Sequence, residues 1–141
     1  MRHLIVLLAW TGAILLLDQW SKHLVLVYVA DRAIRLGPLV TLRRVLSVQR
    51  IHARAGRGGV LVLFWLTALV SALLLIRLGG WFRTSSAQLG LAAAFSGATG
   101  NLLDILRRRA IVDFVDLGWW PVFNLADVAI VAGLLVAFWR G

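Results

Sequence analysis

Long apolar runs, separated by short polar segments, dominate the pattern of this chain. The first run covers residues 4–17 and resumes at 24–30, after a polar notch that contains Asp18 and Lys22. Because a membrane-spanning helix needs about 20 apolar residues, the pattern predicts a single polytopic membrane domain over residues 1–141. We expect an all-α membrane protein with four transmembrane helices, at about 4–29, 59–77, 87–106 and 121–139.

Two segments depart from plain apolar helices. Residues 31–58 carry seven arginines that alternate with aliphatic side chains. This alternation predicts a surface-lying basic segment between the first two spans, built of short strands or an amphipathic helix. The third run is rich in small residues, including Gly90, Gly97 and Gly100. Small side chains let helix backbones approach closely, so we expect the third helix to pack tightly against its neighbours.

The composition excludes a soluble domain of this size. Hydrophobic residues make up 61% of the chain and charged residues only 15%, whereas about 25% of residues are charged in soluble domains. A net charge of +9 suggests nucleic-acid binding in a polar chain, but here the arginines lie between apolar runs. We therefore expect anionic phospholipids as partners and no nucleic acid. With no cysteine and three scattered histidines, we expect no cofactor and no metal site.

Carboxylates are scarce and clustered. The chain has six aspartates and no glutamate, and four of the aspartates fall between residues 104 and 127. Helical spacing puts an amide, a carboxylate and a cation on one face of the third span, at Asn101, Asp104 and Arg108. Asn124 and Asp127 are neighbours on the fourth span. A flexible link precedes that span and is long enough to bring Asp113 against Asp127.

Two carboxylates held together favour acid–base chemistry. They do not both ionise readily, so one holds a proton while the other acts as a base toward water. The alternative is purely structural: each of these aspartates caps a helix or pairs with an arginine at 107–109. This alternative applies to Asp104, Asp113, Asp116 and Asp127.

The remaining polar residues of the spans favour structural roles. Asp18 and Lys22 are four residues apart and are expected to form an ion pair within the first helix. Ser96 and Thr99 lie on the helix of small residues, where no histidine or lysine is placed to activate them. We therefore expect these two hydroxyls to be packing residues.

Four polar blocks lie near the predicted span ends: D-Q-x-x-K at 18–22, G-x-x-G-N-x-x-D at 97–104, V-D-F at 112–114 and P-x-F-N-x-A-D at 121–127. Their order and spacing resemble bacterial lipoprotein signal peptidase, the signal peptidase II family. The resemblance implies an intramembrane aspartic endopeptidase of the bacterial cytoplasmic (inner) membrane. Such an enzyme removes the signal peptide from a prolipoprotein whose cysteine carries a diacylglyceryl group. It also implies an active site near the outer face, cytoplasmic termini and, we expect, a monomer.

The resemblance also assigns roles to single residues. Asp113 and Asp127 match the catalytic pair of the family. Asn101, Asp104 and Asn124 match polar residues that line and support the site, and the motif with Asp18 and Lys22 matches a structural element of the first helix.

Two positions depart from the family pattern. The segment after the first span lacks the usual Asn-x-Gly, and Ser47 is the nearest counterpart. Ile105 stands where an arginine usually follows the third-span aspartate, with Arg107 or Arg108 as possible substitutes. We therefore assign Ser47 and Arg108 to the substrate-binding or supporting set.

Two alternative functions and a conflict of orientation follow from the sequence. The departures leave open an impaired relative that binds lipoprotein or lipid without cleavage. A proton-coupled carrier that uses Asp104 and Asp127 as a relay is the third hypothesis. The family orientation puts ten arginines outside and four inside, whereas the positive-inside rule alone predicts the reverse.

Overall fold

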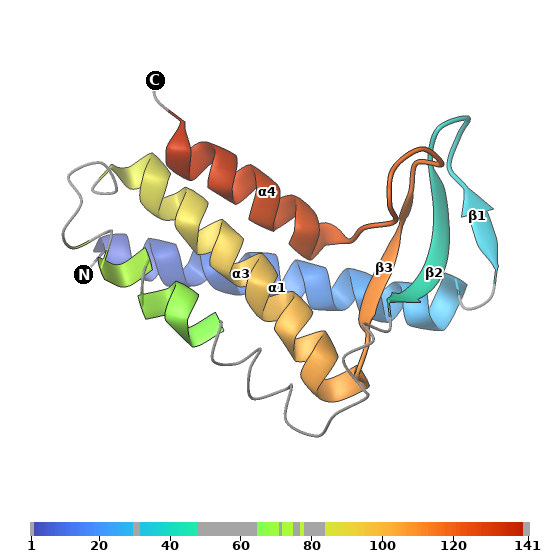
Figure 1. Ribbon diagram of the computed structural model, residues 1–141, viewed down its shortest axis with the longest axis horizontal. Helices are drawn as coiled ribbons and strands as arrows, with labels where there is room; N and C mark the ends of the chain where they lie inside the picture. The colour runs from blue at the N-terminus through green and yellow to red at the C-terminus, as the bar shows by residue number, and fades with distance from the viewer. Residues whose placement is uncertain are drawn as a thin grey trace.

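The computed structural model describes residues 2–29, 32–47, 65–70, 72–74, 77 and 84–139. Within them, long helices lie side by side and a small antiparallel sheet covers one end of the bundle (Figure 1). The elements are α1 (Arg2–Leu24), η1 (Val25–Val29), β1 (Ala33–Arg35), β2 (Thr41–Ser47), α3 (Ser85–Arg108), β3 (Ile111–Asp116) and α4 (Leu125–Phe138). The described part of the chain between 65 and 77 is also helical.

The helices fit the apolar runs of the sequence. The stretch Leu4–Val29 and helix α3 are long and apolar enough to cross a membrane. Helix α4 has 14 residues, and it begins at Leu125 because the backbone of Phe123 still pairs with β3, although the sequence predicts a start at Pro121. The predicted span at 59–77 lies partly outside the described residues, so four spans remain a prediction.

Small residues hold the bundle together, as the sequence predicts. Helix α3 packs against both α1 and α4. A Cβ atom added to Gly90 would lie 2.5 Å from the carbonyl oxygen of Gly133 on α4. A Cβ atom on Gly97 would collide with the backbone of Ala126 and lie 2.9 Å from the side chain of Ile130. Glycine at both positions therefore allows α3 and α4 to touch through their backbones.

The described part of the basic segment forms strands rather than an amphipathic helix. Strands β1 and β2 pair as an antiparallel hairpin, and the sheet order is β1-β2-β3. Residues 48–58, with the other arginines of this segment, lie outside the described residues.

Strand β3 corrects the prediction of a flexible link between the last two helices. Its register on β2 pairs Leu46 with Val112 and Val45 with Asp113, with an irregularity between Leu42 and Val45. The strand forms because β2, far away in the sequence, supplies its hydrogen-bonding partner. The fold is therefore a helical bundle with a three-stranded sheet, to which the segment between the last two helices contributes a strand.

The sheet is fixed to the bundle at the end of the first helix. Phe114 packs against Val25 and Val29 in a small apolar cluster. Beyond β3 the chain turns back, so that the N–H groups of Phe114 and Val115 both donate to the carbonyl oxygen of Phe123. This return brings the first turn of α4 next to β3.

Candidate active site

Asp127 lies in the first turn of α4 and is held by Asn124. The Asn124 side chain accepts a hydrogen bond from the N–H of Asp127 at 3.0 Å, and the N–H of Asn124 donates to Oδ2 of Asp127 at 3.1 Å. This reciprocal pair is a capping box. Asp127 therefore does cap a helix, as the structural alternative proposes, but its Oδ1 atom remains for other partners.

Asp113 comes from β3 and is held by the same asparagine. The Asn124 Nδ2 atom donates to Oδ1 of Asp113 at 2.7 Å, and the Ser47 hydroxyl on β2 donates to Oδ2. Asp113 is only 7% exposed. Burial raises the pKa of Asp113, and the negative charge of Asp127 raises it further, against the hydrogen bonds from Ser47 and Asn124.

Asn101 on α3 connects this pair to the middle of the bundle. Its Nδ2 atom donates to Oδ1 of Asp127 at 2.9 Å, while its Oδ1 atom accepts from Nδ2 of Asn124 at 3.2 Å. The Lys22 ammonium on α1 donates to the same oxygen at 3.0 Å. One amide thus joins α1, α3 and α4.

A buried ionic cluster lies behind Asn101. The expected pair of Asp18 and Lys22 is present at 2.8 Å, and Lys22 also contacts Oδ2 of Asp104 at 2.9 Å. Arg108 forms an ion pair with the other oxygen of Asp104. The side chains of Asp18, Lys22 and Asp104 are completely buried. Each of these charges has an opposite partner, which is the condition for burying it.

Asp18 also reaches the beginning of α4. Its Oδ1 atom accepts a hydrogen bond from the N–H of Ala126 at 2.9 Å, which satisfies one of the free donors of that helix end. A Cβ atom on Gly100 would collide with the Asp18 carboxylate. In the G-x-x-G-N block, Gly97 therefore makes room for α4 and Gly100 for Asp18.

The structure brings the predicted site residues together at the sheet end of the bundle. Arg107 is exposed, whereas Arg108 contacts Asp104, so the cation lies one helical turn beyond Ile105. Asp116 pairs with Arg43 of β2 at the sheet surface, and not with an arginine at 107–109 as the structural alternative proposes.

Among the described residues, the hydroxyl groups of Ser96 and Thr99 form hydrogen bonds only with backbone carbonyl groups and with one indole. The Ser96 hydroxyl donates to the carbonyl oxygen of Thr11, and the Thr99 hydroxyl donates to that of Phe95 while it accepts from the indole of Trp65. Both are consistent with the packing role expected for them.

Gln19 is a site residue that the sequence reasoning missed. Its amide nitrogen donates to Asp18 at 3.1 Å, to the Gly100 carbonyl at 3.2 Å and to Asp104 at 3.3 Å. Arg108 in turn donates to the Gln19 oxygen at 3.5 Å. The signal was its place in the D-Q-x-x-K block, where it follows a buried carboxylate.

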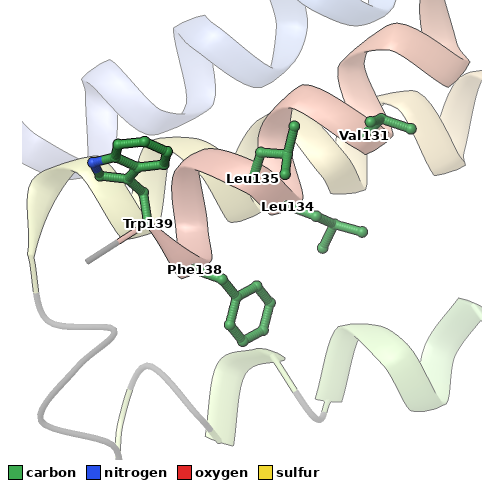
Figure 2. Close-up of a pocket in the computed structure, with 5 residues that line it drawn as sticks. All are labelled: Val131, Leu134, Leu135, Phe138 and Trp139. Carbon is green, nitrogen blue, oxygen red and sulfur yellow. The ribbon is translucent and has the colours of Figure 1, made fainter. Parts of the chain in front are cut away.

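An apolar track leads away from Asp127. Asp127 lines a hollow of about 290 Å³ together with Trp120, Phe123, Val128, Val131, Ala132 and Leu135. A second hollow of about 490 Å³ shares Val131 and Leu135 with the first and continues to Phe138 and Trp139 (Figure 2). The track therefore runs along α4 with a carboxylate at one end. Among the described residues, no three histidine, aspartate or glutamate side chains form a metal site.

Comparisons with known proteins agree with this arrangement. The sequence profile of signal peptidase (SPase) II matches residues 10–140. A lipoprotein signal peptidase of Nitratidesulfovibrio vulgaris is 32% identical over 94% of this chain and 87% of that protein. One of Methylobacterium is 36% identical over 95% of this chain and 87% of that protein.

Solved structures share the fold. A bacterial membrane enzyme solved by the in meso method at 1.9 Å resolution superposes with a TM-score of 0.78 at 17% identity, covering 93% of this chain and 88% of that one. A second such structure, at 2.3 Å, gives a TM-score of 0.76. From the profile match over nearly its whole length and these full-length relatives, the chain belongs to the signal peptidase II family of membrane peptidases.

Proposed function

We propose that this protein is an intramembrane aspartic endopeptidase that removes the signal peptide from lipid-modified prolipoproteins. Asp113 and Asp127 are the proposed catalytic pair, and Asn101, Asp104, Asn124, Ser47 and Arg108 support them. The observation that carries this proposal is that one residue, Asn124, hydrogen-bonds both carboxylates.

The chemistry needs one carboxylate and one carboxylic acid. The carboxylate takes a proton from water as the water oxygen bonds to the scissile carbonyl carbon, and the acid gives its proton to the carbonyl oxygen. These two transfers give a tetrahedral diol. The aspartate that took the proton from water then protonates the leaving nitrogen, and the C–N bond breaks. The aspartate that gave up its proton recovers one from a hydroxyl group of the diol. The pair ends as it began, so no cofactor is required.

Exchange of each aspartate for asparagine tests the pairing. Asp113→Asn and Asp127→Asn keep the shape of the side chain but remove its acid–base function, so each variant should cleave a lipidated prolipoprotein at least about 100-fold more slowly. The matched control is Asp116→Asn, the same change on the same strand at a carboxylate that pairs with Arg43; it should retain activity. Normal turnover by either catalytic variant would refute the pairing.

The apolar track supports a substrate whose cleavage site adjoins a hydrophobic segment. A signal peptide has an apolar core and can lie along α4 with its scissile bond at Asp127. The hollow beside Asp127 is lined otherwise by aromatic and aliphatic side chains, which suits such a segment and not a polar peptide.

The departures from the family pattern fit an active enzyme better than an impaired one. Ser47 hydrogen-bonds Asp113, and Arg108 supplies a cation to Asp104, so both altered positions still serve the site. The impaired relative is the remaining candidate if the wild type binds a prolipoprotein but never cleaves it. A carrier with an Asp104 relay is disfavoured because Lys22 and Arg108 both pair with Asp104.

We also propose four membrane passes in the bacterial inner membrane, with the site near the outer face and both termini in the cytoplasm. The beginning of α1 and the end of α4 lie at one end of the bundle and the sheet lies at the other (Figure 1), which supports this placement. Trp119 and Trp120, exposed next to the sheet, suit the membrane interface. Arg32 and Arg35 are also exposed there and can bind anionic phospholipid head groups.

A further inference from the structure

The hydrogen bonds of the Lys22 ammonium determine which end of the Asn101 amide faces it. A lysine ammonium has three N–H donors and no acceptor. The Lys22 ammonium, with its side chain completely buried, has three oxygen partners, on Asp18, Asp104 and Asn101. Arg108 lies on the far side of Asp104 and does not compete for them. The Asn101 partner must therefore be its oxygen.

A second donor fixes the same orientation. The Asn124 amide nitrogen also points at the Asn101 oxygen, at 3.2 Å. Were the Asn101 amide reversed, its N–H groups would face two other donors and its oxygen would face the Asp127 carboxylate. Both contacts are unfavourable in a buried site, so the Asn101 N–H is committed to Asp127.

This orientation makes the two aspartates unequal. The oxygens of Asp127 face N–H groups, from the Asn101 amide and the Asn124 backbone, and such partners can only donate. One oxygen of Asp113 also faces an N–H, but the other faces the Ser47 hydroxyl, which both donates and accepts. Two N–H donors stabilise a carboxylate, whereas a hydroxyl tolerates a proton on its partner.

Position and access point the same way. Asp127 lies in the first turn of α4, where a negative charge is stabilised by the helix end, and it lines the open hollow. Asp113 lies on a strand and is buried. Water and substrate therefore meet Asp127 first.

We infer that Lys22 is a positioning residue, which holds the Asn101 amide so that Asp127 is the water-activating base and Asp113 keeps the shared proton. This inference rests on the proposed function. Without the cation behind it, only Asn124 and Asp127 hold the Asn101 amide, so its N–H is held less firmly toward Asp127 and the division of the pair into acid and base is weakened.

Infrared spectroscopy locates the proton without an activity assay. As the pH of the purified protein is lowered, the first carboxyl group to take up a proton gives its own C=O stretching band. Asp113→Asn should remove this band, and Ser47→Ala should shift it because Ser47 contacts Asp113. Ser96→Ala, which removes a buried hydrogen bond to Thr11 elsewhere on α3, should leave the band in place. A band that remains in Asp113→Asn, or that does not shift in Ser47→Ala, overturns the assignment of the proton to Asp113.

Kinetics test the role of Lys22. Lys22→Met should lower kcat about 10-fold or more with KM changed less than about threefold, and it should alter the pH dependence of kcat. Asn101→Asp provides a second variant in case Lys22→Met does not fold. It keeps an oxygen toward Lys22 but replaces the donor to Asp127, so its kcat should fall similarly.

Two outcomes separate this inference from the proposed function. If the folded variants lose stability as Ser96→Ala does but keep kcat and the pH profile, Lys22 has only a structural role and the inference is wrong. A wild type that never cleaves contradicts the proposed function, whereas an active wild type with an unmoved infrared band contradicts this inference alone.

Discussion

Asp113 and Asp116 stand on the same strand, yet their surroundings shift their protonation in opposite directions. The N–H of Gly118 and the Arg43 guanidinium hold the pKa of Asp116 below its ordinary value. Burial holds the pKa of Asp113 above it, and the charge of Asp127 adds to this effect. A single strand therefore carries an ordinary surface carboxylate and a carboxyl group suited to keep a proton.

The raised pKa of Asp113 predicts how activity depends on pH. An acid must be protonated to act, so activity should fall as pH rises through the pKa of Asp113. The Ser47 hydrogen bond lowers this pKa, so Ser47→Ala should raise it and move the alkaline limb of the kcat profile to higher pH. Ser96→Ala is the matched control. A limb that moves to lower pH in Ser47→Ala would contradict the role of Asp113 as the acid.

At the scale of helices, the contact between α3 and α4 depends on the absence of side chains. Gly90→Ala would place a Cβ atom 2.5 Å from the backbone of Gly133, so the helices must separate. We expect a loss of about 1–3 kcal/mol, as for other overpacked cores, measured by unfolding in detergent. Gly12→Ala is the control, because nothing lies within 4 Å of the added atom. Equal stability of the two variants would contradict close backbone packing.

The beginning of α4 shows what local sequence patterns do not contain. Pro121 suits a first helical turn, so the sequence favours a start there. The actual start, at Leu125, is set by the Asn124 cap and by the pairing of Phe123 with Val115 on β3. This pairing depends on a strand that exists only because β2 binds it, and no spacing within the segment reveals such a partner.

For the whole molecule, the features that the sequence predicts are those that depend on residues close together along the chain. The apolar runs gave the helices, and helical spacing placed Asn101, Asp104 and Arg108 on one face. Contacts between helices were not predictable in the same way, because they depend on how far each helix slides along the next. The bond from Lys22 to Asn101 is such a contact, and it places Lys22, expected only as one half of an ion pair, next to the proposed active site.

The orientation of the molecule in the membrane is the point at which the family resemblance and the positive-inside rule conflict. Arg43 and Arg108, both on the sheet side, are paired with Asp116 and Asp104. Each pair has no net charge, but the positive-inside rule counts arginines and lysines rather than net charge, so a direct measurement of orientation is needed.

Cysteine labelling decides the orientation, since the chain has no cysteine of its own. Leu39 is 71% exposed at the turn between β1 and β2. In a Leu39→Cys variant, the single thiol should react with a membrane-impermeant maleimide in intact spheroplasts. In a Ser85→Cys variant, the thiol lies at the opposite end of the bundle and should react only after the membrane is opened. The reverse pattern would place the aspartate pair on the cytoplasmic side. There it would meet a prolipoprotein before export, and an outer-face signal peptidase would no longer be tenable.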